Sequence, residues 1–87
     1  MENPANNKVL SELQPGQRAT VTGLCGESGL RRRLQDLGLI EGSGVRCMER
    51  SPLGDPTAYR ICGAVVALRR EDAGAVRIST GDEYAGA

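Results

Sequence analysis

The sequence contains no histidine, no phenylalanine and no tryptophan, and these absences exclude several functions. Without histidine the chain lacks the side chain that most often performs acid–base catalysis near neutral pH and most often binds transition metals. Two tyrosines are the only aromatic residues. The stacking platforms of RNA-binding proteins and the aromatic grooves of proline-recognising domains are therefore not expected, and no enzyme active site can be named.

An excess of basic charge and a long apolar run are also missing. Eleven Lys and Arg balance eleven Asp and Glu, whereas a surface that follows phosphate backbones needs a basic excess. No apolar run approaches the roughly 18 residues of a membrane-spanning helix. The N-terminal segment is polar and lacks the apolar core that a signal peptide requires. We therefore expect a cytoplasmic protein that binds no nucleic acid and does not insert into a membrane.

Cysteine is scarce and scattered. Cys25, Cys47 and Cys62 are odd in number and widely spaced, which argues against a disulfide framework and against the close cysteine pairs of zinc sites. Three lone cysteines offer at most a soft, incomplete metal site, and a buried cysteine is most often a small core hydrophobe. We expect no cofactor and no metal ligands, with Cys47 and Cys62 on neighbouring strands. An adaptor whose cysteines sense iron or thiol oxidation stays open as an alternative.

Apolar patterning places one small domain in these 87 residues. The segments 1–8 and 80–87 show no apolar periodicity, so we predict a single domain over 9–79 between two disordered tails. Alternating apolar and β-branched residues predict five short strands, over 18–24, 45–50, 57–62, 64–68 and 76–78.

Two further segments complete the predicted elements. Residues 64–68 are apolar on both faces, so we expect the most buried strand there. Residues 69–75 are typical of one helical turn.

Leucine spacing predicts one short helix over about residues 29–37. The leucines recur at the spacing of a single helix face: Leu30, Leu34 and Leu37. Ser28 is the expected N-cap, and Gly38 stands where helices commonly end in a left-handed residue, with Leu39 folding back onto the last turn. Five strands with a helix after the first predict a mainly β fold, a small, partly open SH3-like barrel. A two-layer α+β sandwich is the competing architecture.

Three segments, in this order and spacing, resemble the FeoA (ferrous iron transport protein A) family. They are LQDLGLIEGSGV at 34–45, SPLGDP at 51–56 and ALRREDA at 67–73. The resemblance covers residues 10–79, and family patterns often carry proline where this chain has Glu41. It implies a non-enzymatic SH3-like barrel that docks on, or regulates, the cytosolic G domain of FeoB, a membrane ferrous-iron transporter.

The resemblance leaves two other roles open. The same barrel occurs in iron-dependent repressors, so a stand-alone interaction module of that type is an alternative, although no DNA-binding helix-turn-helix precedes it here. An RNA-binding SH3-like barrel is disfavoured by the zero net charge and the missing aromatics. Exposed strand edges of an open barrel also allow weak pairing between copies, so a weak homo-oligomer stays open.

The first candidate partner-binding surface is the charged face of the predicted helix, formed by Arg31, Arg32, Arg33, Gln35 and Asp36. Arginines near the N-terminus of a helix and an aspartate near its C-terminus oppose the helix macrodipole. A solvated face with an Arg32–Asp36 pair would explain this placement, and so would a docking face for an acidic partner.

The second candidate surface is the rigid loop formed by Pro52, Leu53, Gly54, Asp55 and Pro56. An exposed Leu53 between two prolines loses little entropy on binding, which suits a contact point. The alternative is a plain hairpin connection in which Leu53 folds back onto the core.

Overall fold

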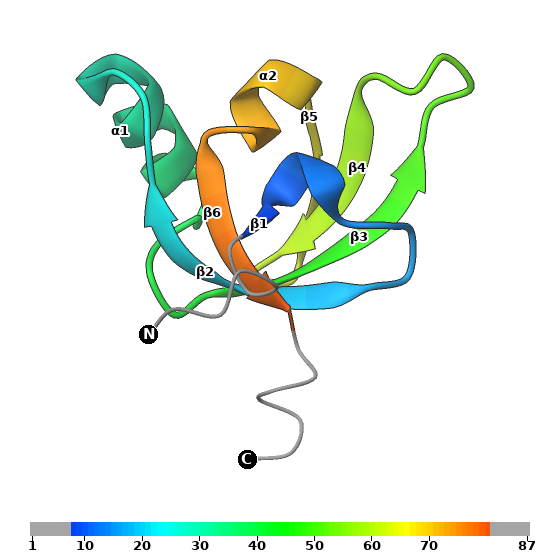
Figure 1. The fold of residues 1–87 in the computed structure, drawn as a ribbon, viewed down its shortest axis with the longest axis horizontal. Helices are drawn as coiled ribbons and strands as arrows, with labels where there is room; N and C mark the ends of the chain where they lie inside the picture. The colour runs from blue at the N-terminus through cyan, green and yellow to red at the C-terminus, as the bar shows by residue number, and fades with distance from the viewer. Residues whose placement is uncertain (1–7, 81–87) are drawn as a thin grey trace.

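The computed structural model describes residues 8–80, which form one strongly curved antiparallel sheet with two short helices at one end (Figure 1). The elements are β1 (Lys8–Val9), the 3-10 turn η2 (Leu10–Glu12), β2 (Arg18–Leu24), α1 (Ser28–Asp36), β3 (Gly44–Arg50), β4 (Thr57–Ile61), β5 (Ala64–Leu68), α2 (Arg70–Ala73) and β6 (Val76–Thr80). The strand order is β1-β6-β2-β3-β4-β5, and each neighbouring pair is antiparallel. The outermost strands β1 and β5 are not neighbours in this order, so the barrel is partly open, as predicted.

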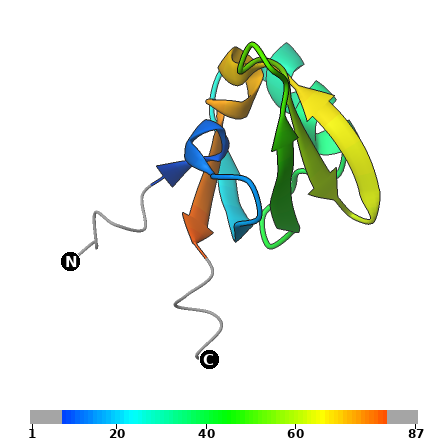
Figure 2. The ribbon, with the colours of Figure 1, turned by 90° about the vertical axis from the view of Figure 1, so that its right-hand side faces the viewer.

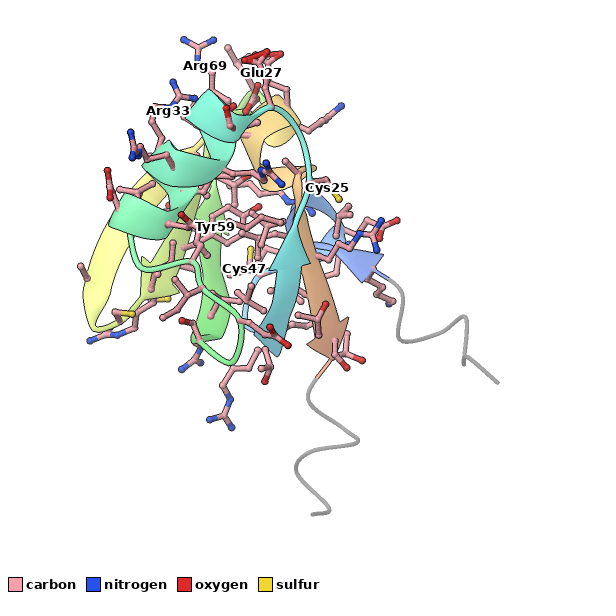
Figure 3. All side chains as sticks on the ribbon, turned by 90° about the vertical axis from the view of Figure 1, so that its left-hand side faces the viewer. Cys25, Glu27, Arg33, Cys47, Tyr59 and Arg69 are labelled. Atoms are coloured by element: carbon pink, nitrogen blue, oxygen red, sulfur yellow. The ribbon has the colours of Figure 1, made fainter. Side chains whose placement is uncertain are left out.

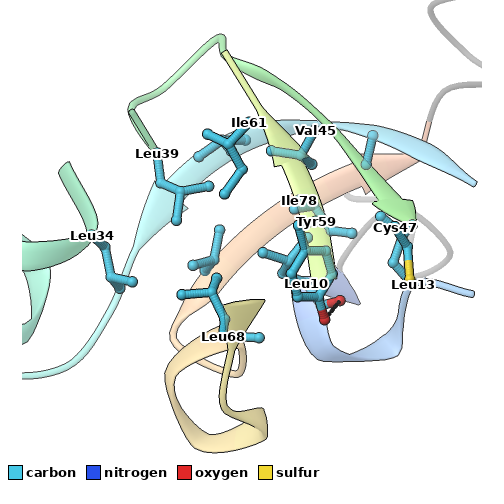
Figure 4. Close-up of a cluster of buried hydrophobic side chains, with 14 of the residues drawn as sticks. Leu10, Leu13, Leu34, Leu39, Val45, Cys47, Tyr59, Ile61, Leu68 and Ile78 are labelled. Atoms are coloured by element: carbon cyan, nitrogen blue, oxygen red, sulfur yellow. Dashed lines mark hydrogen bonds between the residues drawn. The ribbon is translucent and has the colours of Figure 1, made fainter. Parts of the chain in front are cut away.

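The curvature of the sheet encloses the core (Figure 2). Alternate residues of β2, β3, β4 and β6 face inward and are buried: Ala19, Val21, Val45, Cys47, Tyr59, Ile61, Val76 and Ile78. Leu10 of η2, Leu13 directly after it and Leu34 of α1 also point into the core (Figure 4). Full burial of one such side chain stabilises a fold by about 1.5–3 kcal/mol. Tyr59 satisfies its buried hydroxyl by donating to the Leu10 carbonyl, at 3.3 Å.

The ends of α1 follow helix-capping chemistry only in part. The helix starts at Ser28, so the N-cap is Glu27 rather than the predicted Ser28, and Glu27 makes no side-chain capping bond. At the other end Gly38 has φ +103, and the Leu39 N–H reaches back to the Leu34 carbonyl, at 3.0 Å. This C-terminal turn was predicted from the sequence, and it buries Leu39 completely. Leu37 stays 38 % exposed, so the helix buries a narrower face than its leucines indicated.

The prediction that residues 64–68 form the most buried strand was wrong. These residues are β5, an edge strand that pairs with β4 alone, and Val65 is 60 % exposed. A run that is apolar on both faces is typical of a central strand, but here nothing in residues 8–80 covers the outer face. Only Leu68 of this strand is fully inside the core.

The chain ends of the domain extend slightly beyond the predicted strands. β1 contains only two residues, too few for alternation to reveal, and β6 continues to Thr80. Apart from Lys8 and Thr80, the predicted tails 1–8 and 80–87 lie outside the described residues. Neither α1 nor α2 is long and apolar enough to cross a bilayer.

Candidate partner-binding site

The two predicted partner-binding surfaces both reach α2, at one end of the barrel (Figure 1). On one side, the Arg33 guanidinium lies 3.8 Å from the Asp72 carboxylate of α2. On the other side, the Arg70 backbone N–H of α2 donates to Asp55 Oδ1 in the 51–56 loop, at 2.8 Å. The helix face and the loop are far apart in the sequence, and α2 joins them into one end of the molecule.

A groove of about 610 Å³ lies between α1, the end of β2 and the turn after α1. Its lining combines charged, amide and apolar groups: Gly23, Leu24, Ser28, Gly29, Arg31, Arg32, Gln35, Ile40 and Glu41. Arg31, Arg32 and Gln35 were predicted from the sequence, and the structure brings them together here. Arg33 instead points toward α2, so the predicted arginine cluster is divided between two neighbours.

Sequence reasoning missed the apolar part of this groove. Ile40 is 53 % exposed although it directly follows the fully buried Leu39. Ile40 was not singled out from the sequence, because only the course of the backbone after Leu39 shows that its side chain points outward. Ile40 and Leu24 give the groove an apolar wall beside its two guanidinium groups.

The charged face of α1 is exposed to solvent. The predicted Arg32–Asp36 pair does not form, and the one ion pair within residues 8–80 joins Arg33 to Asp72. That pair is weak, because the Arg33 side chain is 67 % exposed and solvent screens it. Arg31 and Arg32 are exposed and oppose the macrodipole, so an acidic surface placed against them would be stabilising.

The 51–56 loop holds an exposed apolar tip. Leu53 is 92 % exposed, so the alternative in which it folds back onto the core is wrong. Two backbone bonds hold the loop closed, from the Ser51 N–H to the Pro56 carbonyl at 3.1 Å and from the Gly54 N–H to the Ser51 carbonyl at 2.8 Å. A leucine presented on a closed loop can bind an apolar pocket at little entropic cost.

The three cysteines are separated in the structure (Figure 3 labels two of them). Cys47 is a core residue, as predicted. It stands opposite Tyr59, and burial raises the pKa of its thiol. Cys62 is not on a strand: it occupies the turn after β4 with φ +51 and is exposed. Cys25 lies near Arg77, with Nε to Sγ at 3.1 Å. Residues 8–80 contain no group of three or more potential metal ligands.

Known proteins match most of this chain at the level of sequence. The model of the FeoA domain matches residues 8–80. A protein of Porphyromonas gingivalis, the Fe(2+) transport protein A/Fe(2+) transporter FeoB fusion protein, is 36% identical over 69 residues. The match covers 79% of this chain but only 8% of the fusion protein.

Two solved structures extend the comparison to the fold. FeoA from Chlorobium tepidum is 39% identical with a TM-score of 0.77, over 83% of this chain and 69% of that one. The zinc complex of FeoA from Stenotrophomonas maltophilia, a prokaryotic SH3 domain protein, is 29% identical with a TM-score of 0.73, over 82% of this chain and 88% of that one. The predicted SH3-like architecture is thus confirmed.

Proposed function

Because the chain belongs to the FeoA domain family, we propose that it is a non-enzymatic accessory protein of ferrous iron uptake that binds the cytosolic part of an FeoB-type transporter. The observation that carries this proposal is the Porphyromonas gingivalis relative, in which the corresponding segment and the transporter are one polypeptide. Fusion keeps two parts at a high effective concentration, which favours parts that act together. A role beside the cytosolic G domain places the protein in the cytoplasm.

The docking surface of this proposal is the end of the barrel that carries α1, α2 and the 51–56 loop. Arginine and exposed apolar anchors contribute most of the binding energy in many interfaces, and this end offers both. Arg31 and Arg32 lie beside the apolar wall of the groove, and Leu53 projects from the loop. An acidic, partly apolar surface on the transporter would complement them.

A binding titration against the purified cytosolic region of the transporter, with and without guanine nucleotide, tests the proposal. Each of Arg31→Ala, Arg32→Ala and Leu53→Ser should weaken binding by about 1–2 kcal/mol, as truncation of an interface anchor does. Leu53→Ser should leave stability within about 0.5 kcal/mol, because an exposed side chain has little to lose on truncation. Higher salt should weaken the wild-type interaction, because the arginine contacts are screened.

Arg46→Ala and Arg60→Ala are the matched controls, since both are exposed arginines outside the groove. They should bind the cytosolic region as the wild type does. Equal losses in test and control variants would show that the α1 end is not the docking surface. The absence of binding in every nucleotide state would overturn the proposed function itself.

A further inference from the structure

Three arginines form a row across the outer face of the sheet. Arg18 on β2 stands opposite Arg46 on β3, and Arg46 stands opposite Arg60 on β4. All three are exposed. Because neighbouring strands lie about 4.8 Å apart, this arginine row extends over about 10 Å.

The arginine row is not explained by pairing inside the fold. Like charges directly opposite each other on neighbouring strands are destabilising. The one ion pair of the described chain, Arg33 with Asp72, lies on the helices and not on this face. The carboxylate that follows on β3, Glu49, stands opposite Ala58, beyond an irregularity in the ladder. The three arginines repel one another and have no carboxylate partner within residues 8–80. Their placement therefore indicates that an anion outside the fold compensates the repulsion.

The surroundings of the arginine row are convex and partly apolar. Residues next to these arginines along the strands, among them Ala19, Val45 and Ile61, point into the core, so the row lies on the outside of the curved sheet. On the next strand, β5, Val65 stands opposite Arg60 and is 60 % exposed. A convex face does not enclose a peptide, whereas cations beside an exposed apolar side chain fit the headgroup region of a bilayer.

We propose that the arginine row binds the anionic lipid headgroups of the membrane that holds the transporter. This inference rests on the proposed function, which places the protein beside that membrane. Each basic residue close to an anionic surface strengthens binding about fivefold, so the row contributes roughly a hundredfold. The contribution is lost beyond a Debye length of about 10 Å, so the row must touch the surface. Contact with lipid therefore adds to the contact with the transporter.

Co-sedimentation with vesicles tests this inference on the full chain without the transporter. The wild type should bind vesicles of phosphatidylglycerol and phosphatidylcholine in equal parts at low salt, and should not bind vesicles of phosphatidylcholine alone. The triple variant Arg18→Gln/Arg46→Gln/Arg60→Gln should lose about a hundredfold in partitioning. The matched control is Arg31→Gln/Arg32→Gln/Arg33→Gln, which removes the same charge from α1 and should keep most of the binding. Circular dichroism verifies that both variants fold.

Each alternative outcome identifies a different error. Equal losses in the two triple variants would show a response to net charge and overturn the inference. If the arginine-row variant alone lost binding to the lipid-free cytosolic region of the transporter, the row would be a protein interface. That result would also overturn the inference. Retained transporter binding without any vesicle binding would overturn the lipid contact and leave the proposed function intact.

The acidic residues that follow the described chain require one more vesicle-binding measurement. Asp82 and Glu83 come just after Thr80, and Thr80 pairs with Ala19, the neighbour of Arg18. In an Asp82→Asn/Glu83→Gln background the arginine-row substitutions should still weaken vesicle binding about a hundredfold. If the arginine-row substitutions had no effect in this background, the row would act through the two carboxylates rather than through lipid. The inference would then fail.

Discussion

At the scale of single residues, Gly38 is the position where the end of α1 meets the β4–β5 turn. Its φ of +103 is a conformation that side chains rarely adopt. A Cβ at this position would lie 2.8 Å from Cys62 Sγ and 3.3 Å from Ile61 Cγ2. The Gly38 carbonyl accepts a hydrogen bond from the Ser43 hydroxyl at 2.8 Å. Both the conformation and the space around it therefore require glycine.

Gly38→Ala should destabilise the protein by about 2–4 kcal/mol, because the backbone strain alone costs about 1–3 kcal/mol and the contact with Cys62 adds to it. Urea unfolding measures the change. Gly29→Ala is the control: Gly29 lies in α1, and a Cβ there would meet nothing within 4 Å. It should change stability by less than about 1 kcal/mol, in the stabilising direction. Similar losses for both substitutions would contradict this account.

Gly38 also shows what residue patterns can predict and what they cannot. Its left-handed conformation was predicted because glycine follows the last leucine of a helical pattern. The close approach of Cys62 was not predictable, because it depends on where the β4–β5 turn comes back across the barrel. The exposure of Ile40 was not predicted, and that of Leu53 was only one of two alternatives, because apolar identity does not tell whether a residue in a turn points toward the core or away from it.

At the scale of elements, α2 is a single turn whose N-terminus is stabilised by a loop distant in the sequence. Its N-cap residue, Arg69, makes no side-chain capping bond. The Arg70 N–H donates instead to Asp55 Oδ1, at 2.8 Å. A carboxylate at the N-terminus of a helical turn satisfies an otherwise free N–H and interacts favourably with the positive end of the peptide dipoles. Asp55 thereby holds the 51–56 loop against α2.

Asp55→Ala should therefore cost about 0.5–2 kcal/mol of unfolding free energy, the usual cost of losing a capping oxygen. Asp55→Asn keeps an oxygen acceptor and should retain most of the stability. Thermal or urea unfolding of the two variants, compared with Glu71→Ala on the exposed side of α2, measures the difference. Equal behaviour of the alanine and asparagine variants would rule out the capping role.

Elements were predictable where their pattern is local. β2, β3, β4 and α1 follow from alternation or leucine spacing within one to two residues of the observed bounds. The edge position of β5 was not predictable, because it depends on which strands pair, and a strand with one neighbour can have the same composition as a strand with two. β1 escaped prediction because two residues acquire a strand conformation only through pairing with β6.

At the scale of the whole molecule, unfolding exposes two weak acids that the core keeps protonated. Cys47 and Tyr59 stand opposite each other on β3 and β4, inside the barrel (Figure 3). Burial raises the pKa of the Cys47 thiol above its ordinary 9.0, against a smaller opposing effect of Arg50. Burial likewise raises the pKa of the Tyr59 phenol above its ordinary 10.0, and the neighbouring Cys47 adds to the shift.

The free energy of unfolding should consequently fall as pH rises above about 9. Below that pH both groups are protonated in the folded and the unfolded chain and contribute no pH dependence. Above it the unfolded chain releases protons that the folded chain retains, so stability decreases by up to about 1.4 kcal/mol per pH unit for each group. Urea unfolding between pH 7 and pH 11 measures the slope. The variant Cys47→Ala/Tyr59→Phe should show a flatter slope, and an unchanged slope would contradict the assignment.

The candidate site was less predictable than the fold. The residues of α1 and the 51–56 loop could be singled out because charge and rigidity are visible in the sequence. Their meeting on α2 depends on the Arg33–Asp72 and Asp55–Arg70 contacts, which join segments from different parts of the chain. The arginine row is likewise a product of strand register, since Arg18, Arg46 and Arg60 share no motif.

The pairing of β1 with β6 has a consequence for how this barrel can be built into larger proteins. Lys8 stands opposite Ile78, two residues before Thr80, so the described chain begins and finishes on the same pair of strands. β6 runs away from α2 toward Thr80, so this junction faces away from the helical end (Figure 1). A domain with adjoining ends can be appended to a host protein, or inserted into one of its loops, without being stretched. In either arrangement the junction would lie away from the helical end, which suits a module that natural selection can move between separate and fused genes.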